Sequence, residues 1–181
     1  MGRRIRLDEL AEELQKTGAS TTDERPAAMI PAQTLPEGER DLVITRMFDA
    51  PRDLVWKAWT DPSRCMAWWG PRPYPATAME MDVRVGGKWR ICLTGIEDGR
   101  ELWQHGVFRE VDEPERLVFT FVWEDEGERG VENLVTVEFE DRGDKTFMTF
   151  RHSPFLSAGE RDGHNEGWSS TFDRLDVYLA A

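Results

Sequence analysis

The chain has 181 residues, of which 39% are hydrophobic, and this length and composition fit one folded domain with a short appendage. Its formal net charge is -12 and no basic stripe interrupts the acidic background, so a nucleic-acid partner is not expected. No apolar run approaches the roughly 20 residues that cross a membrane, and the N-terminus lacks the apolar core of a secretory signal, so we expect no membrane insertion and a cytoplasmic location. Cys65 and Cys92 have no metal or redox spacing, which predicts reduced, buried thiols.

Aromatic residues divide the chain near residue 41, because every Phe, Trp and Tyr lies between Phe48 and Tyr178. We therefore expect an N-terminal extension over residues 1–40 and a folded domain over residues 41–181. Apolar residues at helical spacing predict one short amphipathic helix in the extension, formed by Ile5, Leu7, Leu10, Ala11 and Leu14. Residues 19–40, with three prolines, predict a flexible linker. The helix is either a docking element or a marginally stable extension, and its short length favours the second.

The folded domain begins with a β-prone run that starts at Asp41 and ends at Asp49-Ala50-Pro51. Pro51 then suits the first turn of a helix with an apolar stripe, which Asp61-Pro62 interrupts. A second short helix is expected from about Asp61 to Trp68, before the break at Gly70-Pro71.

Six further segments alternate in hydrophobicity and are separated by turn residues, which predicts an antiparallel meander. They are Ala76–Val83, Lys88–Thr94, Glu101–Val111, Arg116–Glu124, Glu132–Glu140 and Lys145–His152. The last 20 residues carry apolar side chains at spacings of three and four, which predicts a long helix that His164 opens. One helix cannot cover an apolar face of seven strands unless the sheet closes tightly or a cavity remains between the sheet and the helix. We therefore expect an α+β fold with a ligand site in that cavity.

Ordered motifs extend this interpretation. The first are Ile44-Thr45-Arg46-x-Phe48-Asp49-Ala50-Pro51, Val55-Trp56-x-Ala58-Trp59-Thr60-Asp61-Pro62 and Trp68-Trp69-Gly70-Pro71. Downstream follow Gly86-Gly87-x-Trp89-Arg90, Gly106-x-Phe108-x-Glu110-Val111, Pro114-Glu115-Arg116-Leu117-Val118-Phe119-Thr120 and Gly167-Trp168. From about Asp41 to Leu179 the chain resembles a family of the START-like (SRPBCC) superfamily, namely the homologues of the activator of heat-shock protein 90 ATPase.

The resemblance implies a helix-grip fold, in which a seven-stranded, strongly bent antiparallel sheet wraps around a long C-terminal helix and encloses a cavity. Two short helices would follow the first strand. Family members that act as co-chaperones also carry a separate N-terminal chaperone-binding domain, which residues 1–40 are too few to supply. A chaperone partner is therefore not expected.

Large rings on the strands, at the helix junction and on the last helix are the candidate ligand-binding residues, because such rings contact apolar ligands. They are Trp68, Trp69, Trp89, Trp103, Phe119, Trp123, His152, Phe155, His164, Trp168 and Phe172. Of the tandem pair, we expect one indole to face the cavity opposite Trp168 and its neighbour to pack in the core. Trp56 and Trp59 are expected to be core residues.

Catalysis would most naturally use one of the three histidines, His105, His152 and His164. Alternation leaves open whether His105 faces the cavity or solvent. His152, His164 and Glu166 could bind zinc if the fold gathered them, but the chain has no compact metal-ligand spacing and no nucleophile elbow, so no metal, cofactor or catalytic residue is expected.

The leading hypothesis is a non-enzymatic START-like domain that binds a hydrophobic or amphipathic small molecule. Two alternatives stay open. One is a small cyclase or hydrolase that uses a cavity histidine as a base, and the other is an interaction protein that stimulates a chaperone ATPase. A homodimer also stays open, because symmetric pairs are the commonest oligomers.

Overall fold

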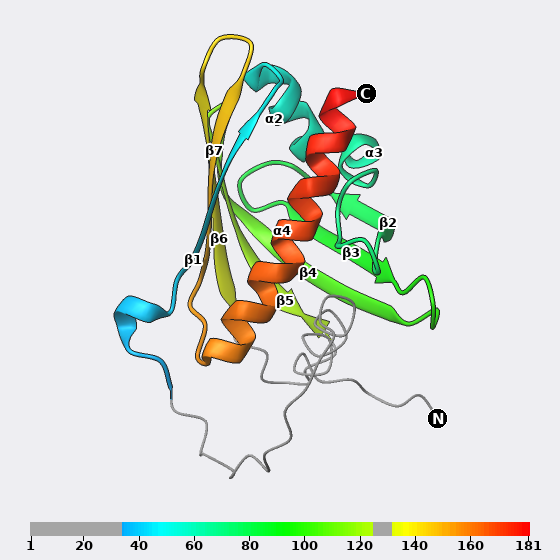
Figure 1. Cartoon of the computed structure of the whole chain (residues 1–181), viewed down its shortest axis with the longest axis vertical. Coiled ribbons are helices and arrows are strands. Elements are labelled where there is room, and N and C mark those ends of the chain that lie inside the picture. The colour runs from blue at the N-terminus through cyan, green and yellow to red at the C-terminus, as the bar shows by residue number, and fades with distance from the viewer. Residues whose placement is uncertain (1–33, 125–131) are drawn as a thin grey trace, which may run out of the picture.

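The computed structural model describes residues 34–124 and 132–181, which form a curved sheet around one long helix (Figure 1). Within these ranges the sheet has seven antiparallel strands in the order β1-β7-β6-β5-β4-β3-β2. The elements are η1 (Glu37–Glu39), β1 (Leu42–Phe48), α2 (Arg52–Thr60), α3 (Pro62–Cys65), β2 (Ala76–Met81), β3 (Lys88–Thr94), β4 (Glu101–Asp112), β5 (Arg116–Trp123), β6 (Asn133–Asp141), β7 (Thr146–Ser153) and α4 (Ala158–Ala180). The α+β helix-grip fold expected from the sequence is confirmed.

Two of the short elements have clear local causes. Asp61 caps α3, since its side chain accepts a hydrogen bond from the Ser63 amide. The helix ends at Cys65, earlier than the expected Trp68, and the Trp69 amide instead bonds back to the Cys65 carbonyl. Gly70 then turns the chain with a φ of 89°, a conformation that side chains disfavour.

The long helix begins earlier than the sequence predicts. It starts at Ala158, six positions before His164, and Ser157 caps it by accepting a hydrogen bond from the Glu160 amide. Its first two turns have Gly159 and Gly163 at the positions where an amphipathic helix would ordinarily have apolar residues. The apolar pattern of the sequence therefore begins only after the helix is under way.

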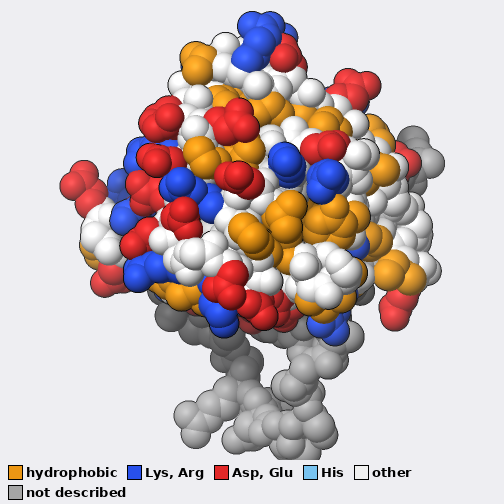
Figure 2. All heavy atoms as spheres, turned by 90° about the horizontal axis from the view of Figure 1, so that it is seen from above, with side chains coloured by type: hydrophobic (Ala, Val, Ile, Leu, Met, Phe, Trp, Pro, Cys, Tyr) orange, Lys and Arg blue, Asp and Glu red, His pale blue; other side chains and the backbone are white. Residues whose placement is uncertain are grey.

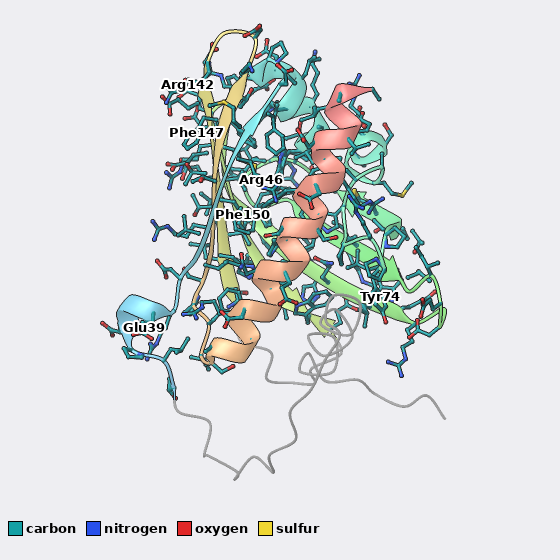
Figure 3. All side chains as sticks on the ribbon, in the orientation of Figure 1. Glu39, Arg46, Tyr74, Arg142, Phe147 and Phe150 are labelled. Atoms are coloured by element: carbon teal, nitrogen blue, oxygen red, sulfur yellow. The ribbon has the colours of Figure 1, made fainter. Side chains whose placement is uncertain are left out.

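Aromatic rings fill the space between α4 and the sheet. The Phe150 ring of β7 lies 4.6 Å from that of Trp168 and 5.1 Å from that of Phe172, both on α4, and Figure 3 shows Phe150 between these two layers. Arg46 ties the edge strand β1 to α4 through an ion pair of 2.7 Å with Asp173. These contacts hold the helix against one half of the sheet.

Residues just before the domain are bonded to it. The Leu35 amide donates to the Leu156 carbonyl, and the Phe155 amide donates to the Arg40 carbonyl. The end of the expected linker thus lies against the loop that leads into α4. The helix expected over residues 5–14 and most of the linker lie outside the described residues.

The surface carries both signs of charge. Figure 2, which looks onto the end that bears α2 and the C-terminus, shows acidic and basic side chains intermingled. Ion pairs on the surface include Arg52 with Glu115 and Arg142 with Glu140. On the side of the sheet away from α4, the Arg142 guanidinium lies 5.8 Å from the ring of Phe147, and the two labels neighbour each other in Figure 3. Among the described helices, none has the length and apolar character needed to cross a membrane.

Candidate ligand pocket between the sheet and the long helix

A pocket lies between α4, the strands β3 to β5 and the turn that contains Trp69. Its cavity has a volume of about 60 Å³. Since a water molecule needs roughly 10–15 Å³ by the same kind of measure, the cavity has room for a few waters in this conformation. The lining residues are Trp69, Gly70, Pro71, Tyr74, Leu93, Gln104, Phe121, Trp123, Gly159, Glu160, Gly163, His164, Gly167, Trp168 and Thr171.

The helical side of the pocket is formed by glycines on successive turns. Gly159, Gly163 and Gly167 all line it and stand four residues apart, so they share one face of α4. A Cβ atom added at Gly159 or Gly167 would meet no atom within 4 Å. Glycine costs a helix up to about 1 kcal/mol relative to alanine. A side chain would therefore fit at Gly159 and Gly167 without a clash. Glycine at these positions lowers the stability of the helix and leaves the pocket open.

The opposite wall is aromatic and comes partly from the tandem tryptophans. Trp69 lines the pocket, and its ring lies 5.3 Å from that of Trp168 at 83° between the planes. Trp68 is fully buried behind it, where its indole N–H donates to the Ala58 carbonyl at 3.0 Å. The two neighbouring indoles therefore occupy different environments, one at the pocket and one in the core.

Arg174 fastens the Trp69 turn to α4. Its guanidinium donates to the carbonyls of Trp69 at 2.9 Å, Gly70 at 2.8 Å and Ala67 at 3.1 Å. The Arg72 amide also donates to the Ser170 hydroxyl of α4. The turn has no regular secondary structure, so these side-chain bonds set its distance from the helix.

Two histidines stand beside the pocket in hydrogen bonds that fix their tautomers. The Trp123 indole donates to Nε2 of His164 at 3.0 Å, while Nδ1 of His164 donates to the Glu160 carbonyl at 2.8 Å. The Trp168 indole donates to Nδ1 of His152 at 3.0 Å. An indole N–H can only donate, so each histidine offers it a lone pair and is neutral.

Burial reinforces this neutral state. It lowers the pKa of His164 to about 4, against the opposing effect of the bond to the Glu160 carbonyl. The pKa of His152 is held well below its usual value by burial first and by the nearby His164 second. The two rings lie 5.3 Å apart, yet no group of three or more metal-binding side chains forms within the described ranges.

The structure separates the predicted residues into three places. Trp69, Trp123, His164 and Trp168 line the pocket. The residues buried behind it are Trp68, Trp89, Phe119, His152, Phe155 and Phe172. Trp103 lies outside the pocket, because inner positions of β4 are the even ones, and the Arg90 guanidinium stacks 3.8 Å from its ring on the outer face.

Sequence reasoning missed the glycines of α4 and an amide side chain of the lining. Gln104 is 2% exposed and lines the pocket from β4, and among the described residues it has no side-chain hydrogen-bond partner. Its signal in the sequence is weak, since an isolated glutamine in an alternating strand is most often a solvent-facing residue.

A second cavity, of about 10 Å³, is also lined by Trp69. Trp59, Trp89 and Phe119 are among its other walls. The indole N–H of Trp59 is buried with no hydrogen-bond partner in the part of the chain that the structure describes. Trp69 thus borders both cavities.

The fold and the pocket define a START-like domain of the helix-grip type. Residues 49–180 match the family model described as "Activator of Hsp90 ATPase homolog 1-like protein". The match spans well over half of the chain, which therefore belongs to this family of the SRPBCC superfamily. No curated protein matches the chain significantly.

Solved structures of bacterial proteins share the architecture. A protein from Arthrobacter aurescens is 26% identical, with a TM-score of 0.70 over 84% of this chain and 92% of its own. A protein from Mycobacterium smegmatis is 28% identical, with a TM-score of 0.67 over 80% and 93%. One from Nitrosomonas europaea is 25% identical, with a TM-score of 0.67 over 80% and 97%.

Proposed function

We propose that this domain binds a hydrophobic or amphipathic small molecule in the pocket between the sheet and α4, and performs no chemistry on it. The glycine face of α4 carries this proposal. Gly159, Gly163 and Gly167 give up helix stability on the side that faces the aromatic wall. A protein that needed only a packed core would gain by filling that face with alanine or larger residues.

The ligand-binding proposal has more support than the enzymatic alternative. The lone pairs of His152 and His164 each accept an indole N–H. A pKa of about 4 also makes His164 a weak base near neutral pH. His105 lies on the outer face of the sheet, 46% exposed, and is hydrogen-bonded to Glu124. None of the three histidines therefore offers a free basic nitrogen to a ligand in the pocket.

Occupancy of the pocket can be tested with a neutral aromatic probe such as N-phenyl-1-naphthylamine. We expect saturable binding that changes tryptophan emission, because Trp69, Trp123 and Trp168 line the pocket. Gly167→Leu should reduce the affinity by roughly tenfold or more, since its side chain would enter the space beside Gly167.

The matched control is Asn165→Leu, which adds a similar side chain to an exposed position of the same helix. It should bind the probe as the wild type does. Thermal unfolding of both variants checks that they are folded. Wild-type protein without a saturable response, or unchanged binding by a folded Gly167→Leu variant, would refute the proposal.

A further inference from the structure

Gln104 is the polar side chain that faces the pocket from the sheet. It lies in β4 between Trp123 of β5 and Ile91 of β3, its register partners. Gly106 and Phe108 follow on the same inner face and are also buried. Position 104 is therefore a core position, where an alternating strand ordinarily places an apolar residue.

The Gln104 amide borders the cavity. It is 98% buried and, within the described residues, it forms no side-chain hydrogen bond. Water in the cavity can solvate this amide, so a bound molecule that displaces the water has to replace its hydrogen bonds. Since the amide borders the cavity, a bound molecule can supply the missing partner.

The rest of the lining favours an uncharged molecule. Among the described lining residues there is no lysine or arginine, and the ionisable side chains are Glu160, the phenol of Tyr74 and the neutral His164. A carboxylate or phosphate would enter a mostly apolar cavity without a counter-charge, which is unfavourable. The net charge of -12 adds a further repulsion for anions.

From this arrangement we infer that Gln104 is the specificity-determining residue of the pocket. The ligand class is an uncharged molecule with an apolar ring system and one carbonyl, hydroxyl or carboxamide group. The amide carries both donors and an acceptor, so it can bond each of these groups. This inference rests on the proposed function, because it names the ligand class of the same pocket.

The test compares probes that share one ring skeleton and differ in one substituent. Naphthalene-2-carboxamide, 2-methylnaphthalene, 2-naphthoate and 2-naphthylmethylammonium are titrated into the full-length protein by ligand-observed NMR. We expect the carboxamide to bind roughly tenfold more tightly than the methyl compound and than both charged compounds, as one buried hydrogen bond allows.

The variants Gln104→Leu and Gln104→Met then separate the two proposals. In both, the carboxamide should lose its advantage, whereas the methyl compound should bind as well as before or better. If every probe binds the wild type equally, or if the variants keep the wild-type preference, the role of Gln104 is refuted while the pocket stands. Tighter binding of either charged probe refutes the ligand class, and absence of all binding to the wild type refutes the proposed function itself.

Discussion

The indole of Trp123 donates a hydrogen bond of 3.0 Å to Nε2 of His164 and so joins β5 to α4 beside the pocket. This bond exists only while Nε2 keeps its lone pair. The other ring nitrogen donates to the Glu160 carbonyl, so protonation of His164 would break the contact between the two elements. The rings around His164 are Phe121 and Trp123 from β5, His152 from β7 and Phe155 from the loop before α4, and Glu160 lies one turn earlier on α4.

Acid should therefore destabilise the protein through its buried histidines. The folded state lowers the pKa of His164 from 6.5 to about 4 and that of His152 in the same direction. Below pH 6.5 the unfolded chain binds protons that the folded chain refuses, so stability falls as the pH drops from 6.5 to 4 and is constant, for these groups, above 6.5. For His164 alone the loss is at most about 3 kcal/mol.

Chemical denaturation across pH 4 to 7.5 measures this dependence. His164→Gln removes a titrating group and should flatten the profile, most clearly between pH 5 and 6.5, where few carboxylates titrate. His105→Gln, at the exposed outer face, is the control and should keep the decline. A His164→Gln profile as steep as that of the wild type would contradict the assignment.

Alanine in place of two glycines should have opposite effects on stability. At Gly159 a Cβ atom meets nothing within 4 Å, so Gly159→Ala should stabilise α4 by about 0.5–1 kcal/mol. At Gly70 the φ of 89° disfavours a side chain, and a Cβ would collide with the Tyr74 carbonyl, so Gly70→Ala should destabilise the fold. Thermal unfolding distinguishes the two. A loss of stability in Gly159→Ala would mean that this face of α4 is not open.

Arg174 should contribute more to stability than an ordinary surface arginine. Arg174→Met removes the guanidinium that donates to three carbonyls of the Trp69 turn, of which only that of Trp69 keeps a second donor within the described residues, the Ala76 amide, and the change should cost about 1–3 kcal/mol. Arg84→Met removes an exposed ion pair with Asp82 and should cost at most about 1 kcal/mol. Urea denaturation measures the free energy of unfolding of both variants. Equal losses would argue against the role of Arg174 in holding the Trp69 turn to α4.

The strands were the most predictable part of the fold, because alternation of apolar residues follows directly from the pleat. The segment Lys88–Thr94 is found with the predicted bounds. The start of α4 was not predictable in this way. Its pocket face is built from Gly159 and Gly163, which carry no apolar signal although they line the pocket.

The site was less predictable than the fold because a strand pattern does not reveal which face is inside. In β4, Trp103 is the more apolar residue and Gln104 the more polar, so burial rules favour the wrong one as a pocket residue. In the structure the even-numbered side of β4 is the buried one, and its Gly106 is closely packed: a Cβ there would collide with the Thr120 carbonyl of the neighbouring strand and with the Trp89 indole. Trp103 is then left on the outer face, where Arg90 covers it.

Trp69 should set the largest ring system that the pocket accepts. Its indole borders both the larger and the smaller cavity, so we expect Trp69→Leu to join the two spaces. We expect this variant to bind a four-ring neutral aromatic such as pyrene more tightly than the wild type does, relative to naphthalene. Loss of a buried indole should also cost about 3 kcal/mol of stability.

Trp68→Leu is the matched control for this change in size preference. It removes a neighbouring buried indole and its bond to the Ala58 carbonyl, but Trp68 lines neither cavity. It should therefore lose stability while keeping the wild-type order of ring sizes. Fluorescence titration with both aromatics measures that order, and the milder Trp69→Phe variant serves if Trp69→Leu does not fold. If both folded tryptophan variants show the same size limit as the wild type, Trp69 does not set that limit, and ligands must stay in the larger cavity beside the glycine face of α4.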